Sequence, residues 1–301
     1  MSLRPVKDVR QSVPTVEGAG VHLRRAFGFG ATSDFDPFLL FDDFRNDDPN
    51  AYLAGFPWHP HRGIETITYV LAGTVEHGDS LGNRGRMGPG DVQWMTAGSG
   101  ILHQEMPQGD RQGRMHGFQL WANLPSSLKM TAPRYQDIAA ADIPEVTEDD
   151  GTRVRVVVGN FWGKKGPVEG VAADPRYLDV SVPPGKQRRL QVDRSNNAFA
   201  YVFAGSGQFR GASEAQAVAT EQVGGPNDGD FDLVSNRSLV LFDRGDEIVV
   251  QAGDEGIRFL LVSGKPLEEP VAWRGPIVMN TQQELQQAYT ELRAGTFIRH
   301  P

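Results

Sequence analysis

Glycine and proline interrupt this chain so often that long regular helices have little room to form. The 301 residues include 35 glycines and 20 prolines, and short runs of β-branched and aromatic residues lie between them. Such runs, bounded by turn-forming residues, are typical of β-strands. The sequence therefore predicts an all-β protein. The clearest of these runs are 66–70, 153–158, 239–242 and 258–262.

One helix is expected near the C-terminus, where apolar residues recur at helical spacing. Thr281 and Glu284 have the spacing of a capping box, in which each side chain bonds the backbone of the other residue. Gly295 follows the periodic segment and is a typical helix stop. The apolar positions between these signals are Leu285, Ala288, Tyr289 and Leu292.

Two short motifs occur twice in the same order, which suggests a duplicated domain. Tyr-Val-Leu-Ala-Gly at 69–73 returns as Tyr-Val-Phe-Ala-Gly at 201–205. A Gly-Asp pair with a second glycine at fixed spacing occurs at 90–98 and again at 245–253. The first copies of the two motifs both precede the second copies, and the order of the motifs is the same in each half, as a tandem duplication requires.

The domain boundary is expected in an acidic, proline-containing segment between the two copies. Residues 139–151 carry little apolar content and have the composition of a linker. This predicts an N-terminal domain at 1–138 and a C-terminal domain at 152–301. The stretch 211–238, rich in Gly, Ala and Asp, is expected to be a long loop within the second domain.

Three histidines and one glutamate fall in two tight pairs. His59 and His61 are two residues apart in the run His-Pro-His, and His103 and Glu105 are two apart in His-Gln-Glu. Side chains two apart on a β-strand point to the same face. Two such pairs on strands brought together would offer three nitrogens and one carboxylate to one divalent cation, with positions left for water or substrate. The pattern indicates a catalytic rather than a structural metal site.

The C-terminal half carries no corresponding group of residues. No histidine occurs between 117 and 299, and aligning the repeated motifs places other residue types opposite the four candidate ligands. One metal per chain is therefore expected, in the N-terminal domain. The aligned positions are Gln191, Asp193, Arg258 and Leu260.

Composition excludes several other classes of function. The absence of cysteine excludes disulfides, thiolate zinc sites, protein-ligated iron–sulfur clusters and cysteine nucleophiles. A net charge of −8 with scattered Lys and Arg argues against direct binding of nucleic acid. No apolar run approaches the roughly 18 residues of a membrane span, and the N-terminus lacks the apolar core of a signal peptide. A cytoplasmic monomer without membrane partners is the expectation, since no heptad pattern suggests an oligomer.

The sequence around the histidine pairs resembles the pirin family closely. The resemblance covers nearly the whole chain and is weakest between 139 and 256. It implies two tandem cupin domains, which are jelly-roll-like β-barrels, with an iron in the N-terminal barrel. The matching segments are 36–44 (DPFLLFDDF), 55–107 around the two pairs, 114–125 (RMHGFQLWANLP) and 275–297.

The resemblance also implies a set of ligands. The three histidines and one glutamate of the family carry over to His59, His61, His103 and Glu105, in agreement with strand parity. Glu65 is an alternative, because it follows His61 at the His-x-His-x3-Glu spacing that many other cupins use. From spacing alone the two glutamates are nearly equal. The resemblance favours Glu105 and leaves Glu65 a supporting or structural role.

Members of the pirin family are credited with opening quercetin between C2 and C3 with release of carbon monoxide. The resemblance thus implies an Fe(II)-dependent quercetin 2,3-dioxygenase that takes a flavonol-like aromatic substrate and O2, with Glu105 as ligand and base. The donor set would also accept Mn, Co, Ni, Cu or Zn. The alternative is a non-enzymatic, metal-dependent regulatory or redox-sensing protein that binds a transcription factor or a metabolic enzyme. A zinc-dependent sugar isomerase or epimerase is a third hypothesis.

Several other residues near the pairs have two interpretations each. His77 and His116 could donate protons in the pocket or only hydrogen-bond elsewhere. Arg62 could attract an anionic substrate, although pairing with an acidic neighbour is favoured. A set of aromatic and methionine side chains could line a substrate slot or equally well fill a core. This set is Phe56, Trp58, Trp94, Met95, Met106, Met115 and Phe118.

Overall fold

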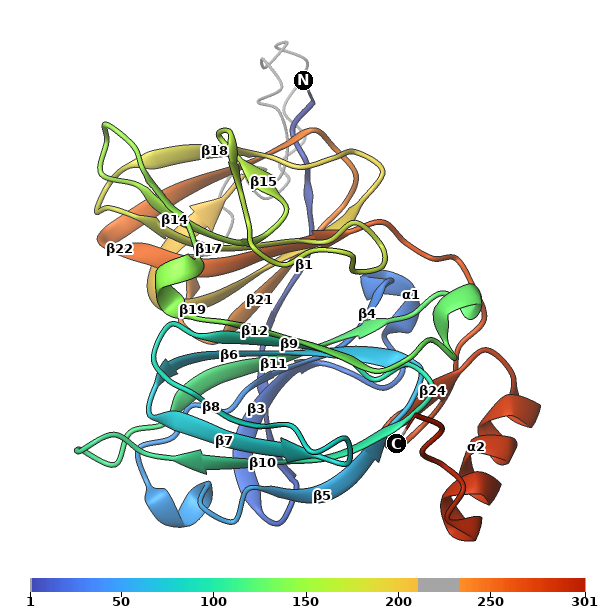
Figure 1. Ribbon diagram of the computed structural model, residues 1–301. Helices are drawn as coiled ribbons and strands as arrows, with labels where there is room; N and C mark the ends of the chain where they lie inside the picture. The colour runs from blue at the N-terminus through green and yellow to red at the C-terminus, as the bar shows by residue number, and fades with distance from the viewer. Residues whose placement is uncertain (1, 211–232, 301) are drawn as a thin grey trace.

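The N-terminal half of the chain folds into two antiparallel sheets (Figure 1). Residues of both sheets line a pocket between them. The computed structural model describes residues 2–210 and 233–300. One sheet has the strand order β12-β9-β6-β11-β4-β3-β2 and the other the order β5-β10-β7-β8. The first sheet comprises β2 (Val13–Glu17), β3 (Val21–Phe27), β4 (Phe38–Asp43), β6 (Ile64–Ala72), β9 (Val92–Thr96), β11 (His116–Asn123) and β12 (Arg134–Ile138). The second comprises β5 (Phe56–His61), β7 (Thr74–Asp79), β8 (Arg84–Met87) and β10 (Ile101–Gln108).

The C-terminal half contributes most of a nine-stranded sheet, which confirms the all-β prediction. Its main path runs β1-β21-β19-β22-β17-β14-β13, with β18 paired to β22 and β20 paired to β19. Its strands are β1 (Val6–Gln11), β13 (Glu145–Thr147), β14 (Arg153–Val158), β17 (Arg176–Val182), β18 (Gln187–Gln191), β19 (Asn197–Phe209), β20 (Val234–Ser235), β21 (Ser238–Phe242) and β22 (Glu247–Gly264). Two small hairpins are β15 (Asn160–Phe161) with β16 (Lys164–Lys165), and β23 (Ala272–Arg274) with β24 (Ile277–Met279).

The predicted C-terminal helix is present as α2 (Gln282–Ala294). The Thr281 side chain accepts a hydrogen bond from the backbone N–H of Glu284, and the Glu284 side chain accepts one from the backbone N–H of Thr281. The predicted capping box is therefore confirmed. Gly295 ends the helix in the left-handed conformation, with φ of 70°. The other α-helix, α1 (Thr32–Phe35), is a single turn. Among the described residues, no helix is both long and apolar enough to cross a lipid bilayer.

Each end of the chain packs against the opposite half of the molecule (Figure 1). Strand β1 pairs with β21 of the C-terminal sheet. At the other end, Ile277 of β24 bridges to Arg62, and α2 lies beside the N-terminal domain. The division of the chain at 139–151 stays a prediction, and this segment contains a 3-10 turn and β13. Of the expected loop at 211–238, residues 211–232 lie outside the described part of the chain.

The largest hydrophobic cluster lies where the two broad sheets meet. It combines buried side chains of the first half, such as Phe41 and Phe118, with Phe199 and Leu260 of the second. A separate cluster of Val, Leu, Ile, Ala and Phe fills the interior of the C-terminal barrel. The two halves therefore pack as one unit, and apolar side chains of the described residues fill the interior of the second barrel.

The tyrosines of the repeated Tyr-Val-x-Ala-Gly motif make matching bonds across this interface. The Tyr69 hydroxyl donates to Asp179 Oδ2 at 2.7 Å, and the Tyr201 hydroxyl donates to Asp43 Oδ2 at 3.0 Å. Each acceptor carboxylate is also paired with an arginine from its own half, Asp179 with Arg258 and Asp43 with Arg45. The bonds have the symmetry expected of a duplicated pair of domains.

Replacing either tyrosine with phenylalanine should loosen this interface. We expect Tyr69→Phe and Tyr201→Phe each to lower the free energy of unfolding by about 1–2 kcal/mol, because each removes a hydrogen bond to a buried carboxylate. Denaturant unfolding followed by circular dichroism measures this change. Tyr177→Phe is the matched control, since its buried hydroxyl has no partner among the described residues. An equal loss in all three variants would contradict a specific role for the two bonds.

Candidate metal centre

The two ligand pairs face each other because β5 and β10 are antiparallel neighbours. His103 lies directly opposite His59 in the ladder, and His61 is opposite Ile101. A bulge on the β5 side follows, so that Glu105 pairs with Phe56 rather than Pro57. Within each pair the alternation of a strand holds, as predicted, and the three histidine rings lie with centroids 4.3–4.9 Å apart.

The backbone orients two of the three imidazoles. His59 Nδ1 lies 2.8 Å from the Pro57 carbonyl, and His61 Nδ1 lies 3.2 Å from the carbonyl of Pro276. If each Nδ1 carries the proton and donates it to its carbonyl, both Nε2 atoms present lone pairs. These two Nε2 atoms are 3.0 Å apart. Two nitrogens bound to one ion at about 2.1 Å and at right angles would have about this separation.

His103 supplies the strongest indication that a cation belongs here. Its side chain is buried, and neither ring nitrogen has a hydrogen-bond partner among the described residues. Burial lowers the pKa of His59 and holds the pKa of His61 and His103 well below the usual histidine value, so all three rings are neutral at pH 7. Neutral, converging and unsatisfied nitrogens suit a metal ion, whose binding would satisfy them. Their candidate ligand atoms lie within 4.8 Å of one another.

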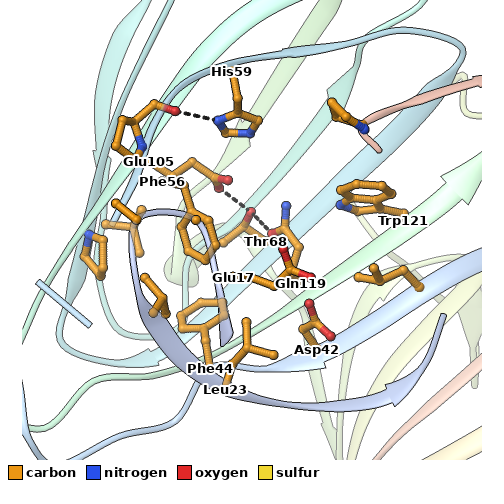
Figure 2. A pocket seen from close by; sticks show the side chains of 18 of the residues that line it. Glu17, Leu23, Asp42, Phe44, Phe56, His59, Thr68, Glu105, Gln119 and Trp121 are labelled. Atoms are coloured by element: carbon orange, nitrogen blue, oxygen red, sulfur yellow. Dashed lines mark hydrogen bonds between the residues drawn. The ribbon is translucent and has the colours of Figure 1, made fainter. Parts of the chain in front are cut away.

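Glu105 lines the same pocket as His59 and His61, although it is not one of the three side chains whose ligand atoms cluster. Figure 2 shows Glu105 and His59 in this pocket. Its Oε1 accepts a hydrogen bond of 3.0 Å from the Thr68 hydroxyl on β6. Burial raises the pKa of Glu105 to about 7, although the bond from Thr68 opposes the shift. A carboxyl group with this pKa can hold or release a proton at neutral pH.

Glu65 lies on the other face of its strand. It is three positions from Thr68 on β6, so it points away from the pocket, toward the C-terminal half. There it accepts a 2.7 Å bond from the Thr96 hydroxyl. Strand alternation counted from His61 would place Glu65 on the same face as the histidines. This expectation fails because Gly63, with φ of 78°, turns the chain between β5 and β6. A side chain at Gly63 would also collide with the Val278 carbonyl.

A cavity of about 460 Å³ adjoins the histidines. Its walls are mostly apolar, and its polar side chains come from both sheets. The main apolar residues are Leu23, Leu40, Phe44, Phe56, Val75 and Trp121. The polar residues besides the histidines are Glu17, Arg25, Asp42, Thr68, Glu105 and Gln119. The size and the apolar walls suit one small organic molecule.

The predicted aromatic set divides between the cavity and the core. Phe56 and Trp58 line the cavity, as the substrate-slot interpretation expects. Met106 packs near Gly55, and the remaining members are buried inside hydrophobic clusters, as the core interpretation expects. Those buried members are Trp94, Met95, Met115 and Phe118.

The remaining candidates near the pairs have structural partners. His77 is the cross-strand neighbour of Glu105 and accepts a bond from Gln93 at 2.9 Å. His116 contacts Phe118 and Phe203 on the far side of the sheet, away from the pocket. Arg62 is buried and pairs with Glu291 of α2 at 2.7 Å, which confirms the favoured interpretation of that residue.

The sequence reasoning missed the wall of the cavity opposite the histidines. Arg25 of β3 and Asp42 of β4 line it, with Gln119 of β11. Trp121 of the same strand lines the cavity beside His61, with ring centroids 5.0 Å apart. One signal was available, since Asp42 is a charged residue inside the apolar run 36–44. A buried charge in such a run needs a partner, and here that partner is Arg25.

Family profiles match both halves of the chain. The family described as Pirin matches residues 20–122, and the Pirin C-terminal cupin domain matches residues 177–298. A pirin-like protein of Caulobacter vibrioides is 43% identical over 99% of this chain and 100% of its own length. Pirin of Homo sapiens is 39% identical over 92% of this chain and 88% of its own. A crystal structure described as quercetin 2,3-dioxygenase from Acinetobacter baumannii has a TM-score of 0.85 at 30% identity, covering 98% of this chain and 99% of that one.

Proposed function

Since the chain belongs to the pirin family of two-domain cupins, we propose that it is an iron-dependent flavonol 2,3-dioxygenase. The observation that carries the proposal is the cluster of three neutral histidines at the wall of an apolar cavity. The similar crystal structure of a protein from Acinetobacter baumannii, which is described as quercetin 2,3-dioxygenase, supports the proposal. The substrate class is a small aromatic enol such as quercetin, and the co-substrate is O2.

The ligands of the proposed site are His59, His61, His103 and Glu105. The fit rests on the unsatisfied nitrogens of His103 and on the facing Nε2 atoms of the other two histidines. When bound, a redox-active metal ion supplies Lewis acidity toward the substrate oxygens and an electron pathway to O2. Iron is the choice that the family resemblance favours, and the same donors accept Mn, Co, Ni, Cu or Zn.

The side chains around the site would bind the substrate and manage its proton. Phe56 and Trp121 offer aromatic surfaces for a flat ring system, and the buried walls exclude water from the reacting bond. Glu105 would accept the proton of the flavonol 3-hydroxyl, because its carboxylate would lie at the metal where the enol oxygen binds. Thr68 would orient the carboxylate through its hydrogen bond. The products are the ring-opened ester, which contains both atoms of O2, and carbon monoxide.

The proposal is tested by anaerobic reconstitution with Fe(II), followed by mixing with quercetin and O2. Oxygen uptake with release of carbon monoxide is the expected result. A protein that holds its metal but shows neither would exclude the dioxygenase. Capture of a protein partner that depends on the oxidation state of the iron, together with inert turnover assays, would then support the regulatory alternative.

Glu105 and Glu65 should differ in their effect on metal binding. We expect Glu105→Ala to lose most of its iron, because it removes a proposed ligand, and Glu65→Ala to keep it, because Glu65 points away from the pocket. Metal content after dialysis, measured by atomic emission against protein concentration, gives the comparison. Full iron content in Glu105→Ala would overturn the ligand assignment.

A further inference from the structure

A row of polar side chains crosses the broad N-terminal sheet along the wall of the cavity. Thr68 lies opposite Gln119 in the ladder of β6 and β11, and Gln119 lies opposite Asp42 of β4. Asp42 in turn lies opposite Arg25 of β3. All four line the cavity, as does Glu105, which Thr68 contacts from the other sheet. The row leads from the proposed base to the Arg25–Asp42 ion pair on the far wall. Figure 2 shows Thr68, Gln119 and Asp42 of this row together with Glu105.

This ion pair is well formed and largely buried. Arg25 donates from Nε to Asp42 Oδ1 at 2.8 Å and from Nη2 to Oδ2 at 2.7 Å. Its Nη1 also lies 2.9 Å from Glu17 Oε1. The exposed fractions of the side chains are 7% for Asp42, 18% for Arg25 and 42% for Glu17. The pair therefore lies inside the pocket, with Glu17 at its solvent side.

The neighbours of the pair along the same wall are apolar. Leu23 and Leu40 precede Arg25 and Asp42 by two positions on their strands, so they share the same face. Charged groups on such a wall lose hydration when a ligand covers them, and only a polar ligand compensates for that loss. Each Asp42 oxygen accepts one bond from Arg25 and can accept another, since a carboxylate has about four acceptor positions.

We infer that the Arg25–Asp42 pair recognises hydroxyl groups on the part of the substrate farthest from the metal, so that the pocket selects polyhydroxylated aromatic molecules. The inference rests on the proposed function for the orientation of the ligand, with its enol at the histidines. A phenolic hydroxyl at the far wall donates to Asp42, while Arg25 holds the carboxylate in place. A ring without hydroxyls covers the ion pair but offers it no hydrogen bond in place of water. Such uncompensated burial is the basis of strong discrimination by polar sites.

Binding of two flavonols to the Fe(II)-loaded protein under anaerobic conditions tests the inference. Quercetin carries hydroxyls on both outer rings, whereas 3-hydroxyflavone keeps only the enol and carbonyl expected at the metal. We expect calorimetric titration to show quercetin binding at least about tenfold more tightly. In the double variant Arg25→Met/Asp42→Leu the two affinities should be within about twofold of each other, since both polar partners are replaced by apolar groups.

The matched control is a second ion pair of similar burial, outside the pocket. Arg188 and Glu148 form it, with exposed fractions of 18% and 12%. The variant Arg188→Met/Glu148→Leu should keep the full preference for quercetin. Asp42→Ala, which removes the acceptor oxygens while Arg25 keeps its contact with Glu17, provides the same comparison if the double variant does not fold.

The outcomes separate this inference from the proposed function. An unchanged preference in the double variant, equal affinities in the wild type, or no binding of either flavonol would overturn the inference. Turnover of quercetin, together with equal affinities for quercetin and 3-hydroxyflavone, would support the dioxygenase and overturn this inference. A preference that depends on Asp42, without oxygen uptake, would keep the inference and remove the dioxygenase.

Discussion

Replacing His103 with alanine is expected to abolish both metal binding and quercetin turnover. Loss of a group that only supports a ligand already costs about 10- to 100-fold in metal affinity, so loss of a central ligand should cost at least about 100-fold. His103 is the histidine whose two nitrogens have no partner among the described residues, which makes the ion its expected partner. Metal content and oxygen uptake, measured on the same sample, give the result.

The control for this variant is another poorly exposed histidine. His116 lies on β11 against Phe203, on the face of the sheet opposite the pocket. His116→Ala should keep its iron and its turnover, even if it unfolds at a lower temperature. Iron retained at one equivalent in His103→Ala would contradict the assigned site.

Glu105→Gln is expected to reduce quercetin turnover roughly 100- to 10,000-fold, the range typical for removal of a general base. Glutamine keeps the size of the side chain and an oxygen that can accept the Thr68 bond, but it cannot take up the enol proton. Single-turnover loss of quercetin absorbance, normalised to bound iron, separates this effect from any loss of metal.

Glu65 offers a closely matched control for that experiment. It is also buried and also accepts one bond from a threonine hydroxyl, that of Thr96. Burial raises the pKa of both glutamates. Glu65→Gln should therefore turn over quercetin at the wild-type rate, and equal rates in both variants would remove Glu105 from the mechanism.

Strand parity predicted the grouping of the histidines because each pair lies within one strand. His59 and His61 are both on β5, and the alternation of a regular strand applies between them. The same reasoning could not decide about Glu65, since the left-handed turn at Gly63 separates it from His61. Spacing in sequence carries geometric information only as far as the backbone stays regular.

The C-terminal helix was predictable, but its place in the molecule was not. Its capping signals are local, whereas its contacts join residues far apart in the chain, such as Arg62 with Glu291. The hairpin of β23 and β24, which precedes the helix, supplies the Pro276 carbonyl that orients His61 and the Val278 carbonyl that accepts a bond from the buried Lys129. The end of the chain thus helps to build a site in its first half, which no spacing rule would reveal.

The far wall of the pocket was missed for a related reason. Arg25 and Asp42 are separated by 17 positions and meet only because β3 and β4 pair in a specific register. Residues that meet across strands require the register, which one sequence does not provide.

The most direct test of one catalytic metal per chain is an anaerobic titration of metal-free protein with Fe(II), followed by quercetin and O2. The rate of carbon monoxide release should rise in proportion to added iron and level off at one equivalent per chain. Oxygen consumed and carbon monoxide released should be equal. A rise that continues to two equivalents, or release that does not depend on iron, would contradict the single site in the N-terminal domain.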